Sequence, residues 1–143
     1  MMNADEGWDH KDMWHKHGKN FLVEVKRHEQ EPFEAGHRFD SGGPNRWCVY
    51  AYIYPKHPHF ANFKGSDMWQ EASAVMPLHG CASLLEYPMY DGQVMTVKVG
   101  CDYNHLHDTN FTQYATPSDA CEVFEDAERL HAWLTDRAME KQA

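Results

Sequence analysis

The segment spanning residues 46–54 is the sequence feature that most constrains the fold. Its residues, RWCVYAYIY, alternate in character and are rich in aromatic and β-branched side chains, which predicts a β-strand with two different faces. The face that we expect in the core consists of Trp47, Val49, Ala51 and Ile53. The other face consists of Cys48, Tyr50, Tyr52 and Tyr54. Two interpretations of the tyrosines remain open: they are covered by a second layer, or they are exposed and contact a partner, because tyrosine supplies a large contact area at low entropic cost.

Residues 78–108 are predicted to form a β-hairpin whose tip lies near residues 91–92, an Asp-Gly pair. A two-residue loop would place Glu86 opposite Val97, and thus a charge beside a core residue. A three-residue loop over residues 91–93 places Glu86 opposite Lys98 instead, which suits an amphipathic sheet. We therefore expect the three-residue loop. The other pairs that this register predicts are Leu85–Val99, Tyr87–Val97 and Met89–Met95.

The open end of this hairpin carries side chains that bind metals or move protons, namely His79, Cys81, Cys101 and His105. The three-residue loop directs all of them to the buried side of the sheet. Three interpretations remain open: a hydrogen-bonded cluster with Tyr103 that closes the core, a zinc site with four N or S ligands, or a cysteine nucleophile with a histidine base, as in a hydrolase-like enzyme. The first is favoured, because the spacing matches no well-attested zinc motif and no oxyanion-hole motif is present.

A long helix is predicted over residues 117–140. Thr116 suits the N-cap, Pro117 the first helical position, and Asp119 the third, where an acidic residue answers the cap. Apolar residues recur at helical spacing and are expected to pack on the sheet; they are Ala120, Val123, Phe124, Ala127, Leu130 and Leu134.

Acidic residues crowd the first turns of this helix, where they form either a solvated face or an electrostatic contact surface. The helix dipole accounts for acidic residues in the first turn only. The candidate partner-binding residues are therefore Asp119, Glu122, Glu125 and Asp126 on the helix and Tyr50, Tyr52 and Tyr54 on the strand.

The remaining segments complete an α+β plan. Residues 21–28 predict an edge strand, residues 66–75 predict a helix, and His57 and His59 are expected in a surface loop. The element order is then β-β-α-β-β-α, an antiparallel sheet of about four strands with the helices packed on one face.

Residues 1–20 are polar and His-rich, which predicts a loosely held N-terminal arm outside a single domain at 21–143. Trp8 and Trp14 in this arm need cover, either from the body of the domain or from a second chain.

The net charge of −9 over 143 residues argues against direct nucleic-acid binding and for a partner with a basic surface. No apolar segment is long enough to cross a bilayer, and the first residues do not resemble a signal peptide. We therefore expect a cytoplasmic protein whose four cysteines are reduced.

Several motifs resemble those of small proteins of unassigned function encoded by tailed phages and prophages. They are Trp47-Cys-Val-Tyr50, Tyr52-Ile-Tyr54, His57-Pro-His-Phe60, Leu78-His-Gly80, the segment from Val99 to Asp108, Phe111-Thr112, Ala115-Thr116 and the segment from Phe124 to Leu130. The resemblance covers about residues 46–134. It implies a small accessory protein that works in a host bacterial cytoplasm, often by binding and inhibiting a host component, and it supplies no catalytic residues.

The sequence thus predicts a non-catalytic protein that binds and inhibits a host defence or nucleic-acid-handling protein. The first alternative is a metal-binding protein or hydrolase-like enzyme that uses His79, Cys81, Cys101 and His105. The second is a sponge for a small nucleotide, whose base would stack on aromatic side chains. Homodimerisation is a further way to cover so many aromatic residues.

Overall fold

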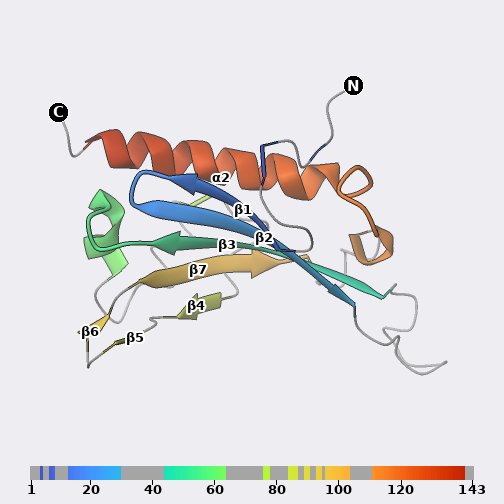
Figure 1. The fold of residues 1–143 in the computed structure, drawn as a ribbon, viewed down its shortest axis with the longest axis horizontal. Coiled ribbons are helices and arrows are strands. Elements are labelled where there is room, and N and C mark those ends of the chain that lie inside the picture. Colours follow the sequence, from blue (N-terminus) through green and yellow to red (C-terminus); the bar gives the residue numbers. More distant parts are fainter. Residues whose placement is uncertain are drawn as a thin grey trace.

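An antiparallel sheet of five strands carries one long α-helix over one of its faces (Figure 1). The computed structural model describes residues 4, 7–8, 13–29, 44–63, 76–77, 84–86, 89–90, 93–94, 96–103 and 111–140. Within these residues, the arrangement confirms the α+β class and the antiparallel sheet predicted from the sequence.

The strand order in the sheet is β1-β2-β3-β7-β4. These strands are β1 (Met13–Gly18), β2 (Phe21–Glu29), β3 (Asn45–Ile53), β4 (Leu84–Glu86) and β7 (Val97–Asp102). A separate two-stranded sheet is formed by β5 (Met89–Tyr90) and β6 (Gln93–Val94). The strand predicted over residues 46–54 is therefore β3, and it occupies the centre of the main sheet.

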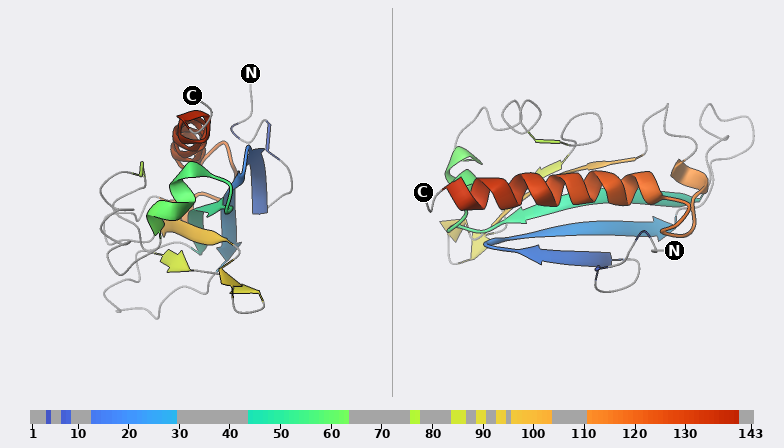
Figure 2. Two further views of the ribbon diagram at one scale, coloured as in Figure 1. Left: turned by 90° about the vertical axis from the view of Figure 1, so that its left-hand side faces the viewer. Right: turned by 90° about the horizontal axis from the view of Figure 1, so that it is seen from above.

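The long helix α2 (Cys121–Glu140) runs lengthwise along the strands (Figure 2). Two short 3-10 helices, η1 (Pro58–Phe63) and η2 (Phe111–Gln113), follow β3 and precede α2. The helix predicted over residues 66–75 lies outside the described residues. The described part of the chain begins with three strands, β1, β2 and β3, whereas the predicted order β-β-α-β-β-α begins with two; the prediction is wrong in this count.

The predicted N-terminal arm is the main correction to the fold. Residues 13–18 form β1 at the edge of the sheet, and β2, which we expected at the edge, lies between β1 and β3. A two-residue turn joins β1 to β2, and Asn20 in that turn has a φ of 65°, a left-handed conformation that asparagine tolerates well. Trp8 and Trp14 are buried in the core, so the domain itself covers them.

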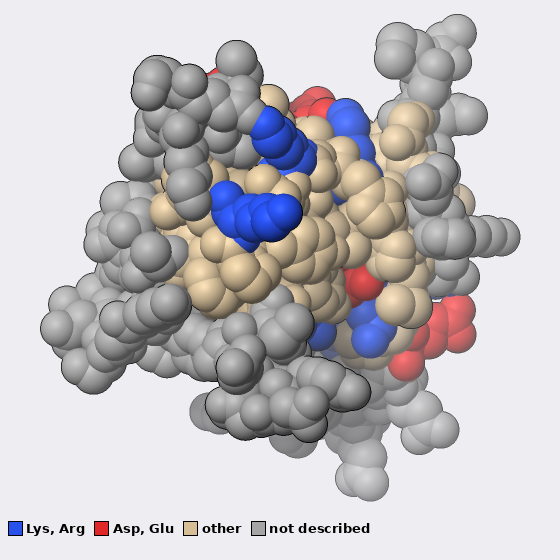
Figure 3. Space-filling model, turned by 60° about the vertical axis from the view of Figure 1, so that its left-hand side comes forward, with Lys and Arg blue, Asp and Glu red and all other residues tan. Residues whose placement is uncertain are grey.

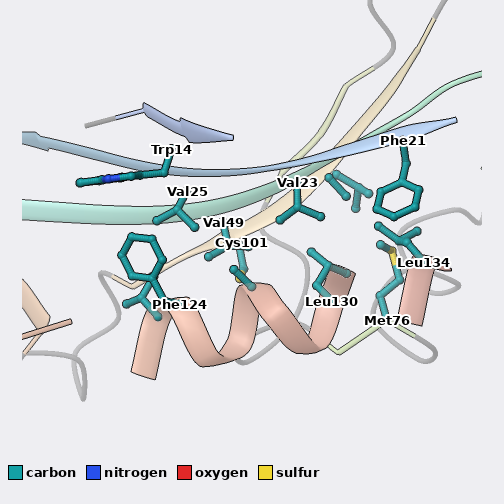
Figure 4. Packing of buried hydrophobic residues seen from close by; sticks show 14 of the residues in the cluster. Trp14, Phe21, Val23, Val25, Val49, Met76, Cys101, Phe124, Leu130 and Leu134 are labelled. Atoms are coloured by element: carbon teal, nitrogen blue, oxygen red, sulfur yellow. The ribbon is translucent and has the colours of Figure 1, made fainter. Parts of the chain in front are cut away.

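The core lies between the sheet and α2 (Figure 4). Trp14 of β1 stacks on Trp47 of β3, with ring centroids 5.5 Å apart and an interplanar angle of 17°. Phe124 of α2 packs on both indoles in T-shaped geometry, with its ring centroid 5.3 Å from that of Trp14 and 6.1 Å from that of Trp47. This three-ring cluster joins the N-terminal strand, the central strand and the helix.

Both amphipathic patterns in the sequence are confirmed. The core-facing residues of β3 (Trp47, Val49, Ala51 and Ile53) are all buried, and so are the apolar positions predicted for the helix (Ala120, Val123, Phe124, Ala127, Leu130 and Leu134). Thr116 Oγ1 accepts a hydrogen bond from the Asp119 N–H at 3.2 Å, the bond expected of an N-cap, but this bond lies in the turn that precedes the helix. The helix itself begins at Cys121, later than predicted, after a turn over residues 117–120.

The register of the 78–108 hairpin is confirmed at its base and wrong at its tip. Glu86 pairs with Lys98 and Leu85 with Val99, as predicted. Near the tip, however, Met89 pairs with Val94, which leaves a two-residue loop at 91–92 rather than the expected three-residue loop. The register therefore changes by one residue between the Glu86–Lys98 pair and the Met89–Val94 pair.

His57 and His59 were expected in a surface loop, and that prediction is wrong. Both are only 1% exposed. His57 donates from Nε2 to the Leu134 carbonyl at 2.9 Å, and its Nδ1 accepts from the His59 N–H at 3.0 Å. The ring of His59 meets Trp133 edge-on, with centroids 4.9 Å apart. The two histidines therefore fasten the end of β3 to α2.

Candidate binding surfaces

The predicted partner-binding residues lie on two surfaces on opposite sides of the sheet. Because α2 covers the core face, the tyrosine side of β3 points away from the helix. We call this side the outer face. Its described side chains include His15 on β1, Leu22, Glu24 and Lys26 on β2, Cys48, Tyr50 and Tyr52 on β3, and Lys98 and Asp102 on β7. The tyrosines of β3 and the acidic residues of α2 therefore cannot contact one flat partner surface together.

A buried carboxylate organises one part of the outer face. Glu24 is only 4% exposed. Its Oε2 accepts a hydrogen bond from His15 Nε2 at 2.7 Å, and its Oε1 accepts one from the Tyr52 hydroxyl at 3.3 Å. A buried carboxylate needs such partners, because an unpaired charge is costly to remove from water. Tyr52 therefore takes part in a polar network and does not project freely into solvent.

Tyr50 lies against a glycine on the neighbouring strand. Gly100 is its register partner on β7, and a Cβ at Gly100 would overlap both the Val49 carbonyl oxygen and the Tyr50 side chain. The ammonium of Lys98 lies 4.5 Å from the Tyr50 ring centroid and 5.4 Å from that of Tyr52, the geometry of a cation–π contact. Lys98 thus makes cation–π contacts with two adjacent tyrosine rings.

The pKa values of this region reflect burial more than charge. Burial is the main cause that raises the pKa of the Tyr50 hydroxyl, and a hydrogen bond with Cys48 adds to it. Burial also raises the pKa of the Cys48 thiol, and it raises the pKa of Tyr54. A thiol with a raised pKa stays protonated at neutral pH, so Cys48 is not an activated nucleophile.

The burial of the tyrosines lies between the two interpretations of them. Tyr50, Tyr52 and Tyr54 are each half-buried, which fits neither a fully covered layer nor freely projecting contact residues. The outer face also carries charges of both signs, with Lys26, Arg46 and Lys98 against Glu24 and Asp102 among the described side chains. In Figure 3 both basic and acidic side chains are visible on the same side of the molecule, among uncharged residues.

The acidic residues of α2 fall into two groups. Asp126 accepts a hydrogen bond from the Tyr103 hydroxyl at 2.6 Å and pairs with Arg129 at 3.0 Å, so it also helps to hold the fold. Glu128 is engaged likewise, by Lys16 at 2.7 Å and by the Trp8 indole N–H at 2.9 Å. Glu122 and Glu125 on α2 and Asp119 in the turn just before it are exposed, and none of the described basic residues pairs with them. We call these three residues the acidic surface.

The predicted metal or nucleophile cluster lies mostly outside the described residues. The residues outside the described part are His79, Cys81 and His105. Cys101 is described; it is 1% exposed and points into the core beside Val49 and α2 (Figure 4). Among the described residues, no three histidine, cysteine or acidic side chains gather in a way that could hold a metal ion.

Sequence reasoning missed the residues that surround the tyrosines, chiefly His15, Glu24, Lys26 and Asp102. A signal for them exists, because alternation along each strand places them on the same face of the sheet as the tyrosines. It becomes readable only once the register of β1 and β2 against β3 is known.

No family model, curated protein or solved structure matches this chain. Within the described residues, no helix has the length and apolar character needed to span a membrane.

Proposed function

We propose that this protein acts by binding a protein partner with a basic surface, without catalysing a reaction, and that the partner contacts the acidic surface of α2. The observation that carries the proposal is that Glu122 and Glu125 are exposed on the first turns of α2, and Asp119 is exposed in the turn just before it. The nearby basic residues Lys16 and Arg129 are engaged by Glu128 and Asp126.

Electrostatics support this assignment. Several carboxylates close together on one element attract a basic partner over several ångströms and speed its association. Because α2 is anchored through Leu130, Leu134 and the Trp14–Trp47–Phe124 cluster, the helix loses little conformational freedom when a partner binds.

A non-catalytic role also fits the chemistry of the described cysteines. Cys48 has a raised pKa, Cys101 lies in the core, and Cys121 is exposed on the first turn of α2. Neither buried thiol has the electropositive, accessible setting of an activated nucleophile.

The resemblance to phage and prophage proteins gives this binding a setting. In that setting the partner is a host protein of defence or nucleic-acid handling, the site of action is the bacterial cytoplasm, and binding inhibits the partner.

The test is affinity capture from a bacterial lysate with the full chain and with a charge-reversal variant, Asp119→Lys/Glu122→Lys/Glu125→Lys. The expected result is a protein that the unaltered chain retains at about 0.15 M salt and that the variant loses. The same protein should elute near 1 M salt, where the Debye length falls to about 3 Å.

The matched control is Glu29→Lys/Asp136→Lys, which reverses charge at exposed positions away from the acidic surface. This control should keep the captured protein. Equal retention by the triple variant and the unaltered chain would exclude the acidic surface as the contact.

A further inference from the structure

The outer face has an arrangement of charge that the proposed function does not use. Lys26 on β2 and Asp102 on β7 are the register partners of the same residue, Cys48 on β3. They therefore stand in one row, with opposite charges on either side of the central strand. Both side chains are half-buried and partly accessible to solvent.

This row is self-complementary. A two-fold axis that runs along β3, between two stacked outer faces, places β2 of one copy over β7 of the other. Lys26 of each copy then faces Asp102 of the other copy, and two identical ion pairs flank the axis. The central strands face each other, so that Tyr50 and Tyr52 meet their own counterparts.

The face as a whole suits a second copy better than a strongly charged ligand. Its described charges are of both signs, three basic (Lys26, Arg46 and Lys98) and two acidic (Glu24 and Asp102), a mixture that favours neither a polyanion nor a polycation. Its half-buried tyrosines supply the amphipathic contact area that is enriched in protein interfaces.

We propose that the outer face forms a two-fold symmetric homodimer in which Lys26 of each copy pairs with Asp102 of the other. Both copies of α2 then lie on the outside, with their acidic surfaces accessible. The dimer does not depend on the proposed function, because it uses the opposite side of the sheet and different residues.

The test is the mass of the full chain measured by light scattering or sedimentation equilibrium, in reducing buffer and over a range of concentrations. The unaltered chain, 16.7 kDa as a monomer, should have twice that mass. Lys26→Glu places two acidic pairs in the interface and Asp102→Lys places two basic pairs there. Each variant alone should raise the dissociation constant of the dimer at least about tenfold.

Mixing the two variants separates the proposal from a folding defect. In a 1:1 mixture, Glu at position 26 of one copy faces Lys at position 102 of the other, and the remaining pair is the original one. The mixture and the double variant Lys26→Glu/Asp102→Lys should therefore both return to the dimer mass. Circular dichroism should show the same folded state for each variant.

The control is Glu125→Lys, a charge reversal on α2 that should leave the dimer mass unchanged. A monomeric unaltered chain at all concentrations would overturn the proposal. A dimer that neither single reversal weakens, or a mixture that stays monomeric, would also overturn it.

Discussion

His57 donates a hydrogen bond from Nε2 to the carbonyl oxygen of Leu134 at 2.9 Å, and so joins the end of β3 to the C-terminal half of α2. The hydrogen bond from the His59 N–H to Nδ1 fixes the tautomer, because the accepting nitrogen carries no proton and Nε2 must carry one. A neutral imidazole in this orientation satisfies backbone groups on two elements that are distant in the sequence.

Replacing His57 by phenylalanine keeps most of the volume of the ring and removes both hydrogen bonds. We expect the free energy of unfolding to fall by about 2 kcal/mol or more, because two buried backbone groups lose their partner. Urea denaturation measures this change. His17→Phe, at an exposed position on β1, is the control and should change stability by less than about 0.5 kcal/mol. An equal effect of the two changes would mean that the His57 hydrogen bonds contribute nothing.

Trp14→Ala tests whether the N-terminal strand belongs to the folded domain. The change removes an indole that stacks on Trp47 and meets Phe124, and it should cost about 3–5 kcal/mol of stability. Met13→Ala is the control, because Met13 is 44% exposed. If thermal or urea unfolding were the same for both variants, β1 would be only loosely attached.

Local patterns in the sequence predicted the elements whose environment is set by their own residues. The two faces of β3 follow from alternation within 46–54, and the buried stripe of α2 follows from helical spacing after Thr116. Both signals are strong because the core residues recur with the period of the element they form.

The errors arose where a position depends on a distant segment. β1 was missed because Trp14 is its one buried side chain beside two histidines and a lysine, which gives too weak a pattern. His57 looked like a surface residue because its hydrogen-bond acceptor, the Leu134 carbonyl, is far along the chain. The hairpin tip was misjudged because one register was assumed for the whole hairpin, whereas the register changes by one residue between the Glu86–Lys98 and Met89–Val94 pairs.

Glu24 should be the residue of the outer face whose loss is most costly. Glu24→Ala leaves His15 and Tyr52 without their shared acceptor, so the free energy of unfolding should fall by about 1–3 kcal/mol. The exposed Glu122→Ala is the comparison, with an expected change below about 0.5 kcal/mol. Equal denaturation midpoints for the two variants would show that the buried network is not stabilising.

Cys48 should react slowly with thiol reagents, and Cys121 quickly. Cys121 is exposed on α2, whereas burial shields Cys48 and raises its pKa above the ordinary value of 9.0. Mass spectrometry after brief alkylation of the native protein at pH 8 should find the label at Cys121 and little at Cys48. Comparable labelling of both thiols would contradict the buried position of Cys48.

The same pKa shift has a consequence for stability. The folded state keeps the Cys48 thiol protonated, while the unfolded chain ionises it at its ordinary pKa. The contribution to stability is therefore fully present below pH 9 and is lost as the pH rises through the raised pKa of the folded state. Cys48→Ser should weaken this loss at alkaline pH, as measured by urea denaturation at a series of pH values.

The central claim is that a partner contacts the acidic surface of α2 and not the outer face. The most direct measurement is lysate capture with two charge-reversal variants side by side, Glu122→Lys/Glu125→Lys on α2 and Lys26→Glu on the outer face. We predict that the α2 variant loses the captured protein and that the Lys26 variant retains it. Retention by the α2 variant together with loss by the Lys26 variant would contradict the claim.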